Sequence, residues 1–379
     1  MRAKHSSRQP AQAAETAKAA GLYYVNDGEP GLTRVGHAKT LRLRGVDGAV
    51  VRDSRIRERV RWLAIPPAWT NVWICPTPRG HIQAMGRDQR GRRQYIYHPA
   101  WRALRDRAKF DRLVAFAQAL ARIRARVGRD LAKRTLCRER VLALVVHLLD
   151  TTHVRVGNEE YARNNGSFGL TTLRDRHARI TGSSLLFEFR AKSGKVQRLR
   201  LSGRKLARMV KACQDLPGQR LFQYLDNGVP KPITSSDVNG YLREISGDDF
   251  TAKEFRTWAG TVLAAAELYE SGSDGECGRH SVPAAIKAVA NKLGNTPAIC
   301  RKCYIHPAIV EGHGTGALVR HLRSFPARRR RVPAALSDNE AAVLAFLGGP
   351  PRTAKRDHGF DRRSAGSRCA RRQRSARNL

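Results

Sequence analysis

The sequence contains few of the features that mark membrane-bound or secreted proteins. No apolar run approaches the ~20 residues that a membrane-spanning helix needs, and the best one, 141–149, is interrupted by His147. The N-terminus has no apolar signal core, so secretion is not expected. The seven cysteines are odd in number and scattered, which fits reduced thiols in a cytoplasm better than a disulfide framework.

Acidic residues are also scarce, and this scarcity is informative. The 379 residues include 32 Asp and Glu against 71 Lys and Arg, for a net charge of +39. Such a chain attracts polyanions, and Arg, which outnumbers Lys, forms bidentate contacts with phosphate. An anionic membrane is disfavoured as the target because no amphipathic anchor is present. We therefore expect a nucleic acid partner and no membrane.

The pattern of the chain divides it into four parts. Residues 1–20 are polar and Ala-rich, which predicts a disordered basic arm. Residues 21–99 contain short β-like runs broken by Gly and Pro, which predicts a β-rich domain. Helical periodicity dominates residues 100–348, and residues 349–379 resemble a disordered basic tail. The expected fold class is therefore α+β, with a small N-terminal domain and a mainly helical second domain.

A small antiparallel sheet is expected inside the helical part. The pattern predicts two helices, over 101–127 and 130–149, and then short strands at 168–173 and 178–180. An alternating strand over 185–189 leads to Lys192-Ser-Gly-Lys195, in which Ser-Gly predicts a two-residue hairpin. That hairpin places Lys192 and Lys195 at its shoulders. A later run of four Arg, 328–331, is interpreted as a linker, and Ser337-Asp-Asn-Glu340 caps a last helix.

Two further helix starts carry polar residues of chemical interest. Thr251 and Glu254 form a capping box, so a helix begins at Ala252 with Arg256 near its N-terminal end. In the second case, a helix that starts near Ser281 ends at Gly294. Asn295 then lies in the break, and a second, short helix carries Tyr304 on its third turn.

The segment 91–97, GRRQYIY, combines basic, amide and aromatic side chains on one expected strand. Tyr95 and Tyr97 share a face of this strand. Arg92, Arg93 and Gln94 add donors that can contact DNA phosphates and base edges. An ordinary half-exposed edge strand explains the same pattern equally well.

Five residues together form a set suited to chemistry on a DNA phosphodiester: Tyr304, Arg155, Lys195, Arg256 and Asn295. Two Arg side chains can neutralise the charge that develops on the phosphate oxygens, and Asn can donate a further hydrogen bond. Tyr can act as the nucleophile when cations stabilise its phenolate, and Lys can protonate the leaving oxygen. Phosphoryl transfer by positioning and electrostatics requires no metal or nucleotide in principle.

The chain resembles a type IB DNA topoisomerase of the small bacterial and poxvirus-like group, whose catalytic domain is also similar to that of tyrosine recombinases. The blocks that carry this resemblance agree in order and spacing across residues 22–312. They are GRRQYIY at 91–97, HVRVGNEEY at 153–161, FGLTTLRDRHARI at 168–180, KSGKVQ at 192–197, KEFRTWAG at 253–260 and LGNTPAICRKCY at 293–304.

The resemblance implies a role for each site residue. It implies that Tyr304 forms a 3′-phosphotyrosyl link, that Arg155 and Arg256 hold the scissile phosphate, and that Lys195 is the general acid. Asn295 stands where poxvirus members carry His. By the same resemblance, Lys253 would be an auxiliary phosphate or base contact, and the strand that bears Gln94, Tyr95 and Tyr97 would face the major groove of duplex DNA. The implied enzyme is a monomer in a bacterial cytoplasm, associated with the nucleoid, and relaxes supercoiled DNA without ATP, metal or any other cofactor.

Two other functions and one metal site compete with this interpretation. A tyrosine recombinase uses the same chemistry, but usually has His-x-x-Arg where this chain has Lys253-x-x-Arg256. A non-catalytic DNA-coating protein would explain the charge but not six ordered blocks. Cys300 and Cys303 suggest zinc, but both fall on one helix and no second CxxC follows, so no metal site is predicted.

Overall fold

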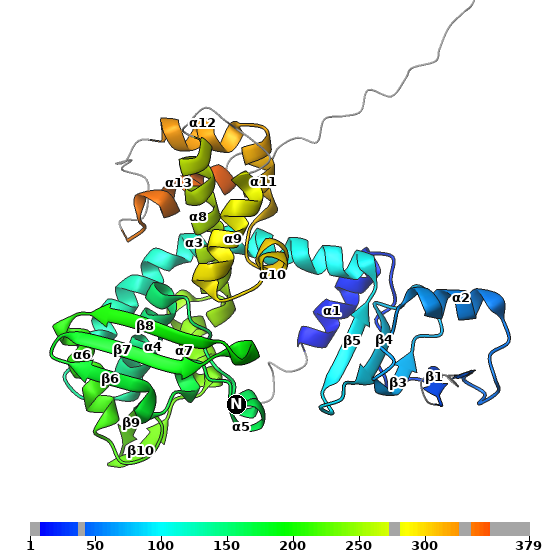
Figure 1. Ribbon diagram of the computed structural model, residues 1–379, viewed down its shortest axis with the longest axis horizontal. Coiled ribbons are helices and arrows are strands. Elements are labelled where there is room, and N and C mark those ends of the chain that lie inside the picture. Colours follow the sequence, from blue (N-terminus) through cyan, green and yellow to red (C-terminus); the bar gives the residue numbers. More distant parts are fainter. Residues whose placement is uncertain (1–7, 37–41, 273–280, 326–334, 349–379) are drawn as a thin grey trace, which may run out of the picture.

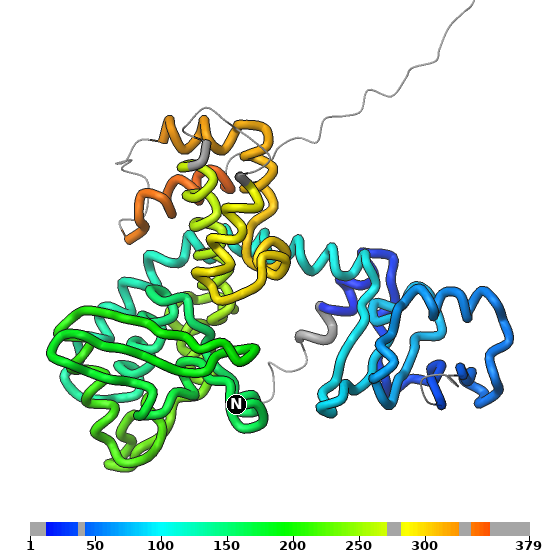
Figure 2. The backbone as a smooth tube through the Cα atoms, in the orientation of Figure 1, coloured from blue at the N-terminus to red at the C-terminus, as the bar shows by residue number. Residues whose placement is uncertain are grey.

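The computed structural model describes residues 8–36, 42–272, 281–325 and 335–348. Two lobes are joined by the long helix α3 (Pro99–Leu131), which begins beside the N-terminal sheet and ends inside the helical lobe (Figure 1). The backbone trace passes from one lobe to the other along this helix (Figure 2). No helix within the described residues has both the length and the apolar character needed to cross a membrane.

The N-terminal lobe is built on a five-stranded antiparallel sheet with the order β2-β1-β3-β4-β5. One face packs against α2, whose Ile56 and Val60 cover the buried Ile74, and the opposite face carries Trp73 and Tyr97. Strand β5 lies at the edge of the sheet. The elements of this lobe are α1 (Arg8–Ala19), β1 (Leu32–Val35), β2 (Arg42–Arg44), α2 (Ser54–Trp62), β3 (Thr70–Ile74), β4 (Ile82–Arg87) and β5 (Arg93–Tyr97).

The expectation of a disordered arm over residues 1–20 is wrong for most of that segment. Residues 8–19 form α1, and the Ala17 side chain is fully buried against Leu22 and Trp101. Alanine has the highest helix propensity, and this contact supplies the tertiary packing that a short helix needs. Residues 1–7 and the expected tail at 349–379 lie outside the described residues, as does the four-Arg run at 328–331.

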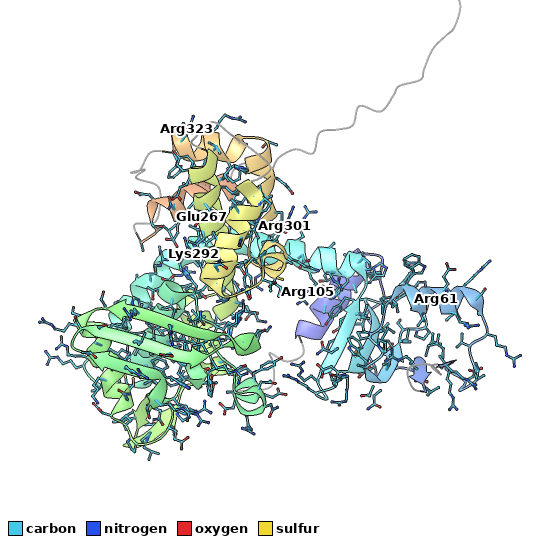
Figure 3. All side chains as sticks on the ribbon, viewed as in Figure 1. Arg61, Arg105, Glu267, Lys292, Arg301 and Arg323 are labelled. Atoms are coloured by element: carbon cyan, nitrogen blue, oxygen red, sulfur yellow. The ribbon has the colours of Figure 1, made fainter. Side chains whose placement is uncertain are left out.

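The helical lobe encloses one large apolar core that takes side chains from α3, α4, α7, α8, α9 and the sheet strand β7. Lys292 of α9 pairs with Glu267 of α8 at 2.9 Å on its surface (Figure 3). The helices are α4 (Arg138–Thr152), α5 (Glu159–Asn165), α6 (Arg204–Gln214), α7 (Ser235–Ser246), α8 (Ala252–Gly272), α9 (Ser281–Leu293), α10 (Pro297–Cys303), α11 (Pro307–Gly314), α12 (Ala317–Ser324) and α13 (Asp338–Leu347).

Two small antiparallel sheets complete this lobe. One has the order β6-β7-β8, and the other is the hairpin β9-β10. A β-rich region followed by a mainly helical one with small antiparallel sheets confirms the α+β expectation. The strands are β6 (Ala178–Thr181), β7 (Ser184–Arg190), β8 (Val196–Ser202), β9 (Gln223–Asp226) and β10 (Val229–Pro232).

Three local predictions differ from the structure. The strand expected at 168–173 is a 3-10 turn over Leu170–Thr172, because the Gly169 N–H bonds to the Thr172 hydroxyl instead of to a neighbouring strand. The helix expected from residue 130 begins at Arg138. The hairpin after β7 has a three-residue turn, because the Ala191 N–H donates to the Lys195 carbonyl at 2.8 Å. Lys192 therefore lies in the turn itself.

Candidate active site

Tyr304 stands at the end of α10, where two sequence signals place it. Gly294, with φ of 61°, ends α9, and the Thr296 hydroxyl caps α10 by accepting from the Ile299 N–H at 3.4 Å. Helix α10 has only seven residues, so Tyr304 is its C-cap and not a residue of a third turn. Its N–H donates to the Cys300 carbonyl at 2.9 Å.

Helix α8 packs directly against the backbone of Tyr304. A Cβ added at Gly260 would lie 2.7 Å from the Tyr304 carbonyl oxygen, which is closer than real Cβ contacts. The Thr261 hydroxyl donates to the same carbonyl oxygen at 3.2 Å. The close approach allowed by glycine thus fixes Tyr304 relative to the helix that also carries Arg256.

Arg256 is buried, with 4% of its surface exposed, and no carboxylate balances it within the described structure. Its guanidinium donates to the His153 carbonyl and, at 2.7 Å, to the Leu293 carbonyl. His153 ends α4 in the left-handed conformation, which turns its carbonyl toward α8. Burial, followed by the nearby Arg155 charge, lowers the pKa of Arg256. The Arg256 guanidinium carbon lies 5.2 Å from the centroid of the Tyr304 ring.

Arg155 and Asn295 meet beside this pair, although 140 residues separate them. An Arg155 N–H donates to the Asn295 side-chain oxygen, which leaves the amide nitrogen directed elsewhere. Asn295 Nδ2 and Arg256 Nε are buried and have no hydrogen-bond partner among the described residues. Buried donors without acceptors are costly, so these two atoms indicate a place for an anionic oxygen.

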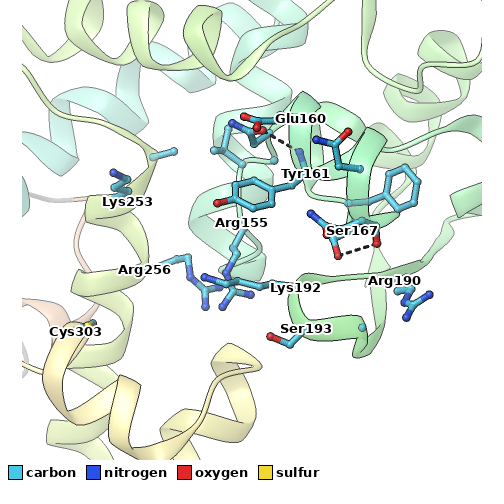
Figure 4. Close-up of a pocket in the computed structure, with 18 of the residues that line it drawn as sticks. Arg155, Glu160, Tyr161, Ser167, Arg190, Lys192, Ser193, Lys253, Arg256 and Cys303 are labelled. Atoms are coloured by element: carbon cyan, nitrogen blue, oxygen red, sulfur yellow. Dashed lines mark hydrogen bonds between the residues drawn. The ribbon is translucent and has the colours of Figure 1, made fainter. Parts of the chain in front are cut away.

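Arg155, Arg256 and Tyr304 border a cavity of about 1330 Å³ (Figure 4), whereas Asn295 stands behind its lining. Its lining includes a single carboxylate, Glu160, against eight cationic side chains. The cations are Arg90, Arg92, Lys109, Arg155, Arg190, Lys192, Lys253 and Arg256. Such a lining favours a polyanion over any neutral ligand. The described residues contain no group of three or more His, Cys, Asp or Glu side chains that could hold a metal ion.

The two lysines of the hairpin differ in their relation to the cavity. Lys192, Ser193 and Gly194 line it, and Lys192 points toward Arg155 and Arg256 (Figure 4). Ser193 and Gly194 have φ of 64° and 75°, so the tip turns sharply. Lys195 is exposed and is not part of the lining.

Strand β5 contributes less to the cavity than its sequence suggested. Arg92, which directly precedes the strand, lines the cavity. Arg92 and the side-chain amide of Gln94 both bond to the Asp88 carboxylate, at 2.7 and 2.9 Å respectively. The Arg92 hydrogen bond is the main reason why the pKa of Asp88 falls to about 2. Tyr95 and Tyr97 stack with ring centroids 5.9 Å apart, outside the lining.

Arg93, the remaining residue of the strand pattern, also lies outside the lining and pairs with Asp27.

Sequence reasoning missed several residues that line the cavity, of which Lys109 and Tyr161 lie nearest to the chemistry. Lys109 of α3 donates to the Cys303 carbonyl, and its ammonium lies 5.8 Å from the Tyr304 ring centroid. Tyr161 of α5 is 48% exposed. A single Lys on an Arg-rich helix carries no local signal, and only the packing of α3 against α10 brings it to the site. The loop residue Arg90 also bonds to Asn165 of α5 at 2.7 Å, which links the two lobes.

A cationic cavity around a tyrosine, between a β-rich and a helical lobe, defines an enzyme that acts on a polyanionic strand. A family model of the eukaryotic DNA topoisomerase I catalytic core matches residues 98–314, which is more than half of the chain. A model of the bacterial DNA topoisomerase IB N-terminal domain matches residues 42–88.

Viral relatives agree with these matches. The chain is 33% identical to the DNA topoisomerase 1B of Acanthamoeba polyphaga mimivirus over 260 residues, which cover 65% of this chain and 77% of the relative. It is 24% identical to the DNA topoisomerase 1B of vaccinia virus (strain Copenhagen) over 235 residues, which cover 60% and 71%. The chain belongs to the type IB DNA topoisomerases and is therefore an isomerase that breaks and rejoins DNA strands.

Proposed function

We propose that this protein relaxes supercoiled duplex DNA by cutting one strand through a 3′-phosphotyrosyl intermediate at Tyr304 and then rejoining it, without ATP or metal. One observation carries the proposal. Arg256 is buried, pairs with no carboxylate of the described segments, and stands 5.2 Å from the Tyr304 ring centroid. An uncompensated buried cation beside a tyrosine is suited to receive the phosphate that the tyrosine attacks.

In the proposed reaction, the Tyr304 oxygen attacks the scissile phosphorus and the bond to the 5′ oxygen breaks. Arg155 and Arg256 contact the non-bridging oxygens, and Asn295 Nδ2 donates to one of them. The phenol loses its proton while cations stabilise the developing phenolate. The phosphotyrosyl link keeps the energy of the broken phosphodiester bond. Rejoining can therefore proceed by the reverse of these steps.

The leaving 5′ oxygen needs a proton, and the geometry favours Lys192 over Lys195 as its source. Lys192 lines the cavity, whereas Lys195 lies outside the lining. Lys253, one turn before Arg256, also lines the cavity and is assigned an auxiliary phosphate contact. A general acid of this kind contributes about 10²- to 10⁴-fold to a rate.

We further propose that the protein acts as a monomer on duplex DNA in a bacterial cytoplasm. In this proposal, residues 21–99 form a DNA-binding cap, residues 100–348 form the catalytic domain, and duplex DNA passes between them. The match to a bacterial N-terminal domain supports the bacterial source. The β5 strand, which contains Arg93, Gln94, Tyr95 and Tyr97, would contact the duplex from the cap side.

The test is relaxation of supercoiled plasmid in EDTA without ATP, by the wild type and by Tyr304→Phe. We expect the wild type to produce a ladder of topoisomers, and the variant to bind DNA normally and relax none. Relaxation by Tyr304→Phe would require another nucleophile. Tight binding without relaxation by either protein would favour a recombinase or a coating protein.

A second test separates the two hairpin lysines. Lys192→Ala is expected to slow cleavage by about 10²-fold or more on an ordinary duplex. It should slow cleavage much less when the leaving group at a mapped site is a 5′-thiolate, which needs no proton. Lys195→Ala is the matched control and should cleave both substrates at nearly the wild-type rate. Rescue of Lys195→Ala alone by the thiolate would return the acid role to Lys195.

A further inference from the structure

Lys109 is the cavity residue whose contacts the mechanism above does not use. It belongs to α3, the helix that joins the lobes, and it reaches α10 across a sequence separation of 194 residues. Its ammonium donates to the Cys303 carbonyl, which belongs to the peptide bond that leads into Tyr304. The same ammonium lies 4.8 Å from the Phe110 ring centroid and 5.8 Å from that of Tyr304.

This placement has two physical consequences. The hydrogen bond fixes the end of a seven-residue helix, whose last carbonyls otherwise have no intrahelical donor. The ammonium also places a positive charge beside the ring of Tyr304. Arg256 contributes a second cation near the same ring, so Tyr304 lies within reach of cations from two different helices.

We propose that Lys109 is a positioning residue for the nucleophile, which anchors the peptide before Tyr304 and holds a positive charge against its ring. This proposal rests on the role assigned to Tyr304 above. In this proposal α3 both connects the two lobes and, through Lys109, supports the peptide that precedes Tyr304.

The charged groups near Lys109 come from three elements. Burial lowers the pKa of Lys109, while Cys303 and Tyr304 at the end of α10, Asp106 on α3 and Glu254 on α8 raise it in part. All of these groups stay in place when Lys109 alone is replaced. A change in pH dependence between variants therefore reports the Lys109 charge.

The experiment measures relaxation rate and SDS-trapped covalent complex between about pH 6 and pH 9, a range that lies below the ordinary pKa of Tyr. Three replacements separate the two contributions. Lys109→Met removes the hydrogen bond and the charge, Lys109→Gln keeps a donor without the charge, and Lys109→Arg keeps both. We expect Lys109→Met to be about tenfold to hundredfold slower than the wild type, as for loss of a charge-assisted hydrogen bond at a reacting group.

The pattern across the variants distinguishes positioning from a merely structural role. Lys109→Arg should recover most of the rate, and Lys109→Gln should fall between Arg and Met. The rising limb of the rate–pH curve should move to higher pH in Met and Gln but not in Arg, because only the first two lose the positive charge beside the nucleophile.

Arg112→Met is the matched control. Arg112 also lies on α3, donates to the Asp249 carbonyl at 2.5 Å and stands 5.6 Å from the Phe250 ring centroid, but it does not contact Tyr304. It should keep the wild-type rate and pH curve. The proposal is overturned if Lys109→Met relaxes DNA as fast as the wild type, or if it is slower by one factor at every pH and Lys109→Arg does not recover. A wild type that relaxes nothing would instead reject the proposed function.

Discussion

Two arginines in the helical lobe, the half-buried Arg124 and the buried Arg256, lie in opposite electrostatic surroundings. Arg124 of α3 bonds to two carboxylates, Asp150 at 2.7 Å and Glu340 at 2.8 Å. Among the described residues, Arg256 of α8 bonds to the His153 and Leu293 carbonyls and pairs with no carboxylate. Burial lowers the pKa of both side chains, but the carboxylates raise that of Arg124 above its ordinary value, whereas that of Arg256 stays below it. The charge of Arg124 is thus balanced by carboxylates within the fold. The charge of Arg256 is not balanced within the described residues and is available to an anionic ligand.

The two surroundings share one helix. Trp258 follows Arg256 by two residues on α8 and donates from its indole nitrogen to Glu340 at 3.0 Å. Glu340 in turn closes the capping box of α13 by accepting from the Ser337 N–H at 2.9 Å. The ion-paired cluster of Arg124, Asp150 and Glu340 therefore contacts, through Trp258, the helix from which Arg256 reaches the cavity. Replacing Arg256 should therefore change the relaxation rate, whereas replacing Arg124 should change the free energy of unfolding.

The largest effect is expected at the arginine without a carboxylate. Arg256→Ala should lower the relaxation rate by about 10³-fold or more, as for other arginines that contact a transferring phosphoryl group. Arg256→Lys should recover little, because an ammonium cannot contact two carbonyls and a phosphate with the fork of a guanidinium. Relaxation rates on supercoiled plasmid, with DNA affinity measured by gel shift, check this. A loss below about tenfold would place Arg256 outside the chemistry.

The opposite result is expected for Arg124→Met. Breaking the cluster leaves Asp150 and Glu340 unpaired in the interior and should lower the free energy of unfolding by about 3–5 kcal/mol. Denaturant titration measures this, and the rate per folded molecule should stay within a few-fold of wild type. Arg198→Met is the control, because Arg198 pairs with Glu188 at 71% exposure and should change stability by at most about 1 kcal/mol. Equal losses in the two variants would contradict the comparison.

The smallest effect concerns acid stability. Burial alone would raise the pKa of Glu340, but hydrogen bonds from Arg124 and the Ser337 backbone outweigh it, and the pKa lies below its ordinary value. A depressed carboxyl pKa stabilises the fold above the unfolded pKa, and this stability is lost as pH falls through the folded pKa. Unfolding titrations from neutral pH to about pH 4 should therefore show a steeper loss for wild type than for the double variant Arg124→Met, Glu340→Gln. Parallel curves would show that the cluster contributes nothing to acid sensitivity.

Local signals in the sequence located much of this molecule. The capping boxes at Thr251 and Ser337 and the Gly294 break placed three helix ends, and the six ordered blocks led to the correct family. What the sequence did not reveal depends on contacts between distant segments. The turn over Leu170–Thr172 is decided by the close approach of Gly169 to Gly157, where a Cβ would lie 2.6 Å from the Gly157 backbone.

The same limit applies within the site. The bond between Arg155 and Asn295 and the reach of Lys109 to α10 join residues 140 and 194 positions apart. Residue type suggested Lys195 as an acid, but the three-residue turn of the hairpin brings Lys192 to the cavity instead. Spacing along a strand or helix does not determine which of two neighbouring lysines faces a cavity.

The 33-residue helix α3 restricts how the two lobes can move relative to each other. It is about 50 Å long, and residues near both of its ends are buried, Trp101 against Ala17 and Leu22 and Val127 in the helical core. Within the described chain, the lobes are connected by this one continuous helix and not by a flexible linker. To separate the two lobes, α3 must bend or the contacts at one of its ends must break.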